Sequence, residues 1–229
     1  MQKIVVLTGA GVSAESGLST FRDAGGLWEG YDVMEVASPE GWHMNRELVL
    51  RFYNERRNQL KTAQPNDAHK AIASLEEKFD VTVITQNVDD LHERAGSTKV
   101  VHLHGELTKA RSSLDSTLVY DIGYGEIKAG DKCERGSQLR PHVVWFGEMV
   151  PMIEVAAHIS EDADIFIVVG TSLVVYPAAS LIEFTRPSII KYIIDPVKPD
   201  MYYFDDNLIF IEEKAGLGMP GLARKLLSN

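Results

Sequence analysis

The chain has 229 residues, which can form one large domain or a large domain with a small insertion. Hydrophobic residues make up 45% of it and charged residues 24%, as in an ordinary soluble globular protein with a sizeable core. The 23 basic and 33 acidic residues leave a net charge of −10, which argues against a nucleic acid or an anionic membrane as the partner.

Short β-branched runs alternate with helical patterns along the chain. We expect strands at 4–8, 81–85, 99–103, 143–145, 165–169, 188–194 and 207–211. Several of these runs are apolar on both faces, which is typical of strands in a parallel sheet that helices cover. We expect helices at 45–63, 66–79, 152–160 and 221–227, the first two capped by Asn45 and Asn66.

This alternation predicts an α/β fold, with a doubly wound, mostly parallel, Rossmann-like sheet and a small inserted module. Two stretches break it: 22–63, a glycine-rich loop followed by helices, and 106–140, which is polar and predicted to be irregular. Both are expected to leave the sheet and pack together. The single domain over 1–229 then divides into a large part at about 1–32, 64–104 and 141–229 and a small module at about 33–63 and 105–140.

The start of the chain is a short apolar strand that runs into glycines. It lacks the basic flank and the long apolar stretch of a signal peptide. No segment approaches the roughly 20 apolar residues that span a bilayer. These features predict a cytoplasmic protein without a membrane partner.

A glycine-rich turn follows the first strand. Segment 9–14, Gly-Ala-Gly-Val-Ser-Ala, has the G-x-G-x-x-G/A spacing that lets backbone approach a pyrophosphate at a helix N-terminus. A tight turn without any ligand is the alternative for this pattern alone. The acidic residue that a dehydrogenase carries about 20 residues further on is missing, because 20–28 has the composition of a loop. A dinucleotide bound here is therefore not held as in a dehydrogenase.

Two further polar clusters follow apolar strands, at the strand ends where ligands of open α/β sheets collect. The first comprises Gln86, Asn87 and Asp89, and the second comprises Gly170, Thr171 and Ser172. Their polar groups suit hydrogen bonds to a sugar, an amide or a phosphate. Helix capping by Asn87 or Asp89 is the alternative for the first cluster.

Two histidines, His102 and His104, lie two apart at the end of an expected strand and would share one face. A histidine can act as general base on a hydroxyl within hydrogen-bonding reach. Metal binding by the pair is the less favoured alternative, because no third ligand is implied nearby. The strand is expected to end at Gly105, so His104 is better placed than His102 to reach a cleft.

Together these segments resemble the sirtuin family over nearly the whole chain. The resemblance rests on five segments in the family's order, at 9–22, 85–92, 102–105, 140–148 and 170–177. It implies one sirtuin-type catalytic domain and a reaction in which NAD and an acyl-lysine give nicotinamide, free lysine and O-acyl-ADP-ribose. NAD would be consumed as a substrate, in agreement with the missing dehydrogenase acid. The implied partners are acylated-lysine proteins or peptides, and we expect a monomer.

The resemblance also implies roles for single residues. His104 would be the general base on a ribose hydroxyl, with Asn87 as a second catalytic residue that also contacts NAD. The other implied NAD contacts are Gly9, Ala10, Gly11, Ser13, Phe21, Arg22, Trp28, Gln86, Val88, Asp89, Gly170, Thr171, Ser172, Asp195 and Ala215. Asp195 stands where the family usually has asparagine, so it keeps an acceptor for ribose hydroxyls but adds a charge.

Substrate contacts are implied in two places. In the family, segment 143–148 pairs with the substrate backbone as an added strand, which implies contacts from Val144, Phe146 and Gly147; a plain core strand is the alternative. Tyr53 and Arg56 lie three apart on an expected helix, hence on one face, and a phenol beside a guanidinium suits a carboxylate. In this place the pair resembles the subclass that removes succinyl and malonyl groups, with acetyl removal also expected.

The chain departs from the family in its metal site. Most members hold a structural zinc with two Cys-x-x-Cys pairs, whereas this chain contains only Cys133, and 111–113 stands where the first pair would be. Such a site needs four Cys or His ligands, so we expect no zinc. The small module would then be held by packing through Leu114, Leu118, Tyr120, Ile122, Tyr124 and Ile127.

Two other functions stay open on the sequence alone. One is mono-ADP-ribosylation from the same NAD site. The other is a non-catalytic sensor of NAD or ADP-ribose, against which the intact Asn87, Asp89 and His104 argue, because a sensor does not need a base beside the ribose.

Overall fold

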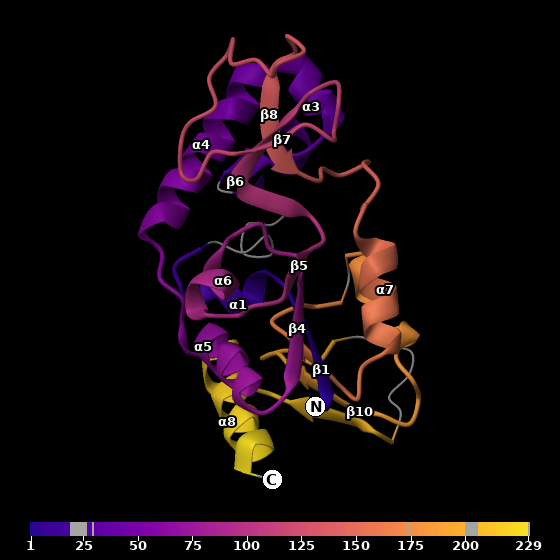
Figure 1. Ribbon diagram of the computed structural model, residues 1–229. Helices are drawn as coiled ribbons and strands as arrows, with labels where there is room; N and C mark the ends of the chain where they lie inside the picture. Colours follow the sequence, from indigo (N-terminus) through magenta and orange to yellow (C-terminus); the bar gives the residue numbers. More distant parts are fainter. Residues whose placement is uncertain (19–26, 29, 174, 200–205, 229) are drawn as a thin grey trace.

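Six parallel strands form the central sheet, and the computed structural model describes residues 1–18, 27–28, 30–173, 175–199 and 206–228, with the backbone alone at 27–28 (Figure 1). The strands are β1 (Lys3–Thr8), β4 (Asp80–Thr85), β5 (Val100–His102), β9 (Ile165–Val169), β10 (Ile190–Ile194) and β11 (Leu208–Ile211). They lie in the order β5-β4-β1-β9-β10-β11, and each neighbouring pair is parallel.

This strand order makes the sheet doubly wound. The chain runs outward from β1 through β4 to β5, returns to β9 beside β1, and runs outward on the other side through β10 to β11. It is the order of a dinucleotide-binding α/β sheet, whose ligand crevice lies outside the strand ends where the order reverses. Here the reversal lies between Thr8 of β1 and Val169 of β9, which are partners in the sheet. The predicted doubly wound α/β fold with a Rossmann-like sheet is confirmed.

Helices cover both faces of the sheet. Those on one face include α5 (Asp67–Ser74) and α8 (Ala215–Ser228), and those on the other are α7 (Ile153–Glu161) and the 3-10 helix η2 (Ala178–Phe184). Along β1, Ile4 and Val6 belong to the first core and Val5 and Leu7 to the second, as the alternation of side chains in a strand requires. Figure 1 shows α5 and α8 on the side of the sheet away from α7.

Short elements link the strands to these layers. They are α1 (Ala10–Ala14) after β1, the 3-10 helix η1 (Leu75–Glu77) after α5, α6 (Leu91–Ala95) after β4, and the hairpin of β2 (Leu27–Trp28) with β3 (Tyr31–Asp32). The Asn66 side chain accepts a hydrogen bond from the Ala68 N–H, and that of Asn45 accepts one from the Leu48 N–H. Both predicted N-caps are therefore confirmed.

A second unit is built around three helices and a small antiparallel sheet. The helices are α2 (Val33–Val36), α3 (Pro39–Met44) and α4 (Arg46–Thr62), and the strands, in the order β7-β6-β8, are β6 (Gly105–Ser112), β7 (Val119–Asp121) and β8 (Leu139–Val143). Phe52 and Leu60 of α4 pack with Leu107 of β6 in a core of their own. Because β6 begins soon after β5 ends, this unit stands next to the carboxyl end of β5 (Figure 1).

The prediction that 106–140 is irregular is wrong, because three strands of the small sheet lie within or beside it. The pairing of β6 with β8 shifts between Glu106 and Ala110, and this bulge interrupts the two-residue period by which strands are found in a sequence. The strand expected at 143–145 ends at Val143 and belongs to the small sheet. The residue bounds of the large part and the small module stay a prediction.

No helix among the described residues is long and apolar enough to cross a membrane.

Candidate active site

The loops after β1 and β9 pack backbone against backbone. Gly9 N donates to the Val169 carbonyl at 3.2 Å, and Gly11 N donates to the Gly170 carbonyl at 2.8 Å. A Cβ on Gly11 would lie 2.7 Å from the Gly170 oxygen, and one on Gly170, whose φ is +61°, would lie 2.4 Å from Val12 N. Side chains are thus excluded at both glycines by the contact of the two loops, whether or not a ligand is bound.

Ser13, Asn87 and Asp89 form a buried hydrogen-bonded group beside these loops. The Asn87 Nδ2 donates to the Gly9 carbonyl and to Ser13 Oγ, both at 3.1 Å. Ser13 Oγ in turn donates to Asp89 Oδ2 at 2.9 Å. Both amide hydrogens of Asn87 are used in this way, so its oxygen is the atom it can present to a ligand. We call Gly9, Ser13, Asn87, Asp89 and Gly170 the switch-point cluster.

Asp89 links the cluster to α6. Its second oxygen accepts from Leu91 N, the first residue of that helix, at 3.2 Å, but the N-cap residue of α6 is Asp90, so Asp89 is not the helix cap. The Asn87 side chain takes no such bond. Burial raises the pKa of Asp89, although the hydrogen bonds from Leu91 and Ser13 oppose this.

A third histidine, His69, lies behind Ser13 and was not singled out in the sequence. Its Nδ1 accepts from Asn66 N at 3.3 Å, so its proton is placed on Nε2, which lies 3.5 Å from Ser13 Oγ. Burial lowers its pKa to about 4, so the ring is neutral at pH 7. The only sequence signal was its position three residues after an N-cap asparagine, which is that of the N3 partner in a capping box.

His102 and His104 differ in how their nitrogens are used. The His102 Nδ1 donates to the Asn87 carbonyl at 3.1 Å and its Nε2 lies 2.7 Å from Glu93 Oε1. Burial lowers the pKa of His102, but the hydrogen bond and charge of Glu93 outweigh it, so the pKa is raised overall. Both nitrogens then carry hydrogens, and the ring is bound on both sides.

His104 carries its hydrogen on Nδ1, which donates to the Gln86 carbonyl at 3.0 Å. This bond places the lone pair on Nε2. Burial lowers the pKa of His104, and the Gln86 bond opposes this only in part, so the basic form prevails at neutral pH. Of the two histidines, His104 therefore has the nitrogen suited to accept a proton.

The other implied NAD contacts lie around the same strand ends, with varied exposure. The Gln86 Nε2 donates to Thr171 Oγ1 at 3.1 Å and joins two of the sequence motifs. Asp195 is buried after β10, where its side chain accepts from Val197 N at 3.0 Å. Ala10 opens α1 and is exposed, Ser172 is half-buried, Val88 is packed against the core of the small unit, and Ala215 opens α8.

Three implied contacts lie outside the described residues. They are Phe21, Arg22 and the side chain of Trp28.

The implied acyl site lies in the core of the small unit. Tyr53 is fully buried on α4, and its hydroxyl oxygen accepts from Trp145 Nε1 at 3.0 Å. Arg56, one turn further along α4, is 7% exposed. An acyl group meets this pair only by entering the interior of the protein.

Arg57, which follows Arg56 in the sequence, is hydrogen-bonded to other groups of the protein. Its Nε donates to the Gly125 carbonyl at 2.9 Å and it also bonds to Asn54 and to the Leu107 carbonyl. Burial lowers its pKa to about 10. Arg57 thus connects α4 to β6 and to the loop that contains Gly125.

The segment after β8 lies between the small unit and His104. Val144 N donates to the His104 carbonyl at 2.9 Å, and Phe146 N donates to the Ala37 carbonyl at 3.0 Å. Gly147 has a φ of +87° and is exposed, and Phe146 is 42% exposed. Val143 and Trp145, by contrast, are buried, so the core-strand alternative holds for part of this segment.

Among the described residues, no group of three or more His, Cys, Asp or Glu side chains is placed to hold a metal ion. At the single cysteine, Ser112 Oγ lies 2.6 Å from Ser137 Oγ, which lies 3.1 Å from Cys133 Sγ. Ile127 is buried in the core of the small unit, and Ile122 and Tyr124 pack against that core as expected. Leu114, by contrast, is 87% exposed, and its predicted packing role is wrong.

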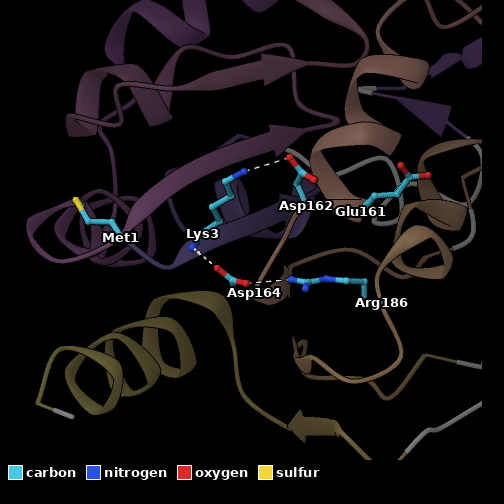
Figure 2. A pocket seen from close by; sticks show the side chains of 6 residues that line it. All are labelled: Met1, Lys3, Glu161, Asp162, Asp164 and Arg186. Atoms are coloured by element: carbon cyan, nitrogen blue, oxygen red, sulfur yellow. Dashed lines mark hydrogen bonds and ion pairs between the residues drawn. The ribbon is translucent and has the colours of Figure 1, made fainter.

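A pocket lies at the opposite end of β1, where the strand begins (Figure 2). Lys3, Asp162, Asp164 and Arg186 line it, and they are paired with one another: Lys3 Nζ with Asp162 at 3.1 Å and Arg186 with Asp164 at 3.0 Å. The strand ends that carry the polar motifs lie at the other edge of the sheet, so this pocket is separate from them.

Comparison with known proteins gives a consistent result. The model of the Sir2 family matches residues 9–177. An NAD-dependent protein deacylase of Helicobacter pylori is 52% identical over 227 residues, covering 99% of this chain and 98% of that protein. One of Bacteroides thetaiotaomicron is 52% identical over 235 residues, covering 99% of each. A solved complex of a Sir2 homologue with NAD is 42% identical, with a TM-score of 0.88, and covers 99% of this chain and 90% of that one.

Proposed function

The chain belongs to the Sir2 family, and on that basis we propose that it is an NAD-dependent protein-lysine deacylase. The acyl group of a modified lysine would be transferred to the ADP-ribose part of NAD, with consumption of one water and release of nicotinamide and of the free lysine. The observation that carries this proposal is His104, whose hydrogen is held on Nδ1 and whose basic Nε2 lies next to the strand ends of a dinucleotide-binding sheet.

The residues of the switch-point cluster fit NAD as a bound substrate. Gly9 and Gly170 bring bare backbone to the crevice where the strand order reverses, and the fixed oxygen of Asn87 offers one acceptor there. We propose that Gly9, Ala10 and Gly11 contact the pyrophosphate and that Phe21, Arg22 and Trp28 are further NAD contacts. Gln86, Asn87 and Val88 would contact the ribose and nicotinamide side, and Gly170, Thr171, Ser172, Asp195 and Ala215 the adenosine side.

Ser13 and Asp89 would act through Asn87. Both oxygens of Asp89 and the hydroxyl of Ser13 are hydrogen-bonded inside the protein. They fix the amide of Asn87 so that its oxygen faces the ligand. Their proposed role is positioning.

His104 would be the general base. NAD, when bound, would supply the ribose carbon from which nicotinamide departs and to which the acyl oxygen bonds. His104 Nε2 would take the proton of a ribose hydroxyl, and the imidazolium would be stabilised by its bond to the Gln86 carbonyl.

The substrate would be an acylated-lysine protein or peptide that binds along Val144, Phe146 and Gly147. Tyr53 and Arg56 favour an acyl group that ends in a carboxylate, such as succinyl or malonyl, over acetyl. Arg56 is assigned this role in preference to its neighbour Arg57, because the Arg57 guanidinium is already bonded to the Gly125 and Leu107 carbonyls. A cytoplasmic location, a monomeric state and the absence of zinc stay predictions from the sequence.

The test is an assay of succinyl-, malonyl- and acetyl-lysine peptides with and without NAD, alongside the His104→Ala variant. Mass spectrometry of the products should show O-acyl-ADP-ribose and free lysine only with NAD and the intact histidine. ADP-ribose attached to protein would support the transferase alternative instead. Binding of NAD without turnover of any peptide would support the sensor alternative.

A further inference from the structure

We propose that His92 is a positioning residue for Asn87, acting on it through the hydroxyls of Thr8 and Thr85. This inference rests on the proposed role of Asn87 as a contact on the ribose and nicotinamide side of NAD. Thr8 and Thr85 are 0% exposed and His92 is 1% exposed, so all three would act through Asn87 and not on NAD itself.

The two threonines end neighbouring strands. Thr8 is the last residue of β1 and Thr85 the last of β4, and the two are partners in the sheet. Thr8 Oγ1 donates to Thr85 Oγ1 at 2.9 Å. Thr85 Oγ1 also accepts from Asn87 N at 3.0 Å, the bond of a turn in which a threonine hydroxyl binds the N–H two residues further on. The Thr85 oxygen therefore fixes the turn that leads from β4 to Asn87.

The bond between His92 and Thr8 has a defined direction. A hydroxyl has a single hydrogen, and that of Thr8 is used toward Thr85. In its 3.0 Å contact with His92 Nε2 the Thr8 oxygen must then accept, which places the ring hydrogen of His92 on Nε2. Burial lowers the pKa of His92 well below its usual value, so the ring is neutral at pH 7. His92 thus orients the Thr8 hydroxyl toward Thr85, and Thr8 in turn keeps the Thr85 oxygen at Asn87 N.

The other ring nitrogen of His92 argues for a functional role. Nδ1 is buried, and within the described part of the chain it has no hydrogen-bond partner. A buried polar atom without a partner costs stability, so an apolar side chain would be favoured here if His92 only filled space. The bond from Nε2 to Thr8 is the contribution that explains a histidine at this position.

Separate groups hold the side chain and the backbone of Asn87. The side chain donates to the Gly9 carbonyl and to Ser13 Oγ, both at 3.1 Å. The backbone N–H donates to Thr85, and the backbone carbonyl accepts from His102 Nδ1 at 3.1 Å. The amide reaches both of its acceptors only if the backbone is correctly placed. Loss of the Thr85 bond should therefore misdirect the Asn87 oxygen, the atom that Asn87 presents to NAD.

The experiment compares the Kd for NAD with the Kd for ADP-ribose, measured by calorimetry without peptide. ADP-ribose lacks the nicotinamide, so the ratio of the two Kd values reports on the side of NAD that Asn87 would contact. Thr85→Val keeps the shape of the side chain but removes the hydroxyl, and should raise the ratio of Kd for NAD to Kd for ADP-ribose about two- to tenfold, as for loss of one hydrogen bond. Thr85→Ser keeps the hydroxyl and should retain the wild-type ratio. Thr82→Val, in the same strand, is the matched control and should leave the ratio unchanged.

The contribution of His92 is tested with His92→Phe. This variant should raise the ratio by less than Thr85→Val does, because Thr85 still accepts from Asn87. Its Tm should not fall, because the unpartnered Nδ1 is removed together with Nε2. The double variant with Thr85→Val should show the ratio of Thr85→Val alone, since His92 acts only through the threonines. A purely structural role would instead lower Tm and leave the ratio as in wild type.

A further measurement on the wild type does not depend on the folding of any variant. Nitrogen NMR of the histidine side chains should show His92 as a neutral ring at pH 7 with its hydrogen on Nε2. A hydrogen on Nδ1 would mean that Thr8 is not oriented by His92.

Equal changes of the two Kd values in Thr85→Val, an equal change of the ratio in Thr85→Ser, additive changes in the double variant, or a His92 hydrogen on Nδ1 would each overturn the inference. A wild type that binds NAD, responds to Thr85→Val as expected and yet deacylates no peptide would overturn the proposed function and leave the role of His92 in place. Wild-type deacylation with an unchanged ratio in Thr85→Val would overturn the role of His92 alone. A wild type that does not bind NAD would overturn both.

Discussion

The switch-point cluster and the core of the small unit both bury polar groups, but the partners of these groups differ between the two regions. At the switch point, glycine backbone and neutral partners such as Ser13 and Asn87 satisfy one another over short, fixed distances. In the small unit, the buried polar groups are charged: Arg57 donates to a loop carbonyl, and Arg111 and Arg140 both bond to Glu148.

The difference predicts what each region tolerates. Close backbone contact leaves no room for an added atom, so the switch point should be sensitive to volume. A network of charges is sensitive to the loss of a charge, because a buried partner left alone is costly. The following predictions set the two regions against each other.

The largest effect on activity is expected at His104, whose ring is held by its hydrogen bond to the Gln86 carbonyl. His104→Ala should lower kcat/KM about 100- to 10,000-fold, because the general base is lost. His102→Gln, the matched control, should cost far less activity, because His102 is bound on both nitrogens. Steady-state kinetics with a fixed peptide measures both, and equal losses in the two variants would contradict the assignment of the base.

The volume limit of the switch point is tested by Gly170→Ala. Its Cβ would lie 2.4 Å from Val12 N at a φ of +61°, and we expect a loss of more than about 3 kcal/mol in the free energy of unfolding. Gly123→Ala has a similar φ of +53° but open space around the Cβ, and should cost only about 1 kcal/mol. Urea denaturation of both variants separates the cost of the steric clash, present only in Gly170→Ala, from the cost of the positive φ, which both variants share. Similar losses would show that strain alone sets the cost.

On the side of the small unit, the loss of a charge is tested by Arg56→Met. Loss of a charge-assisted hydrogen bond should lower desuccinylation about 10- to 100-fold relative to deacetylation. Arg57→Met is its neighbour control and should lower the free energy of unfolding instead, since it frees the Gly125 and Leu107 carbonyls. An equal fall of both activities in Arg56→Met would remove its role in selectivity.

A pH effect is expected from His69, next to the switch point. Its pKa is about 4 in the folded protein, against about 6.5 when exposed, so the unfolded chain binds the proton more readily between these values. The contribution of His69 to the free energy of unfolding is therefore complete above about pH 6.5 and is lost as the pH falls toward 4. At pH 5 the loss is about 2 kcal/mol. Denaturation at pH 7 and pH 5 measures this loss. His69→Gln should make the dependence shallower, and an unchanged slope would assign it to other groups.

The smallest effect is expected from chelation of metal ions. The chain has a single cysteine, Cys133, whose sulfur lies against the Ser137 hydroxyl, so the small unit should keep its thermal stability in the presence of a chelator. Elemental analysis of the purified protein should find no zinc. One equivalent of zinc per chain, or a fall in Tm on chelation, would contradict this.

Much of the sheet could be predicted because its signals are local. The apolar runs of β1, β4 and β9 and the caps at Asn45 and Asn66 depend on residues within a turn or a strand of one another. The small sheet was missed for the converse reason. Its strands pair across loops and contain a bulge, so neither the two-residue period nor a hydrophobic run identifies them.

The sequence by itself determined the doubly wound fold, the family, and the motifs at the ends of the strands, because spacing and residue type along the chain carry that information. Only the tertiary structure decided which groups act on one another. His69 meets Ser13 from 56 residues away, and Trp145 meets Tyr53 from 92 residues away. Neither contact leaves a periodic trace in the sequence, since a hydrogen bond through space depends on how the layers pack.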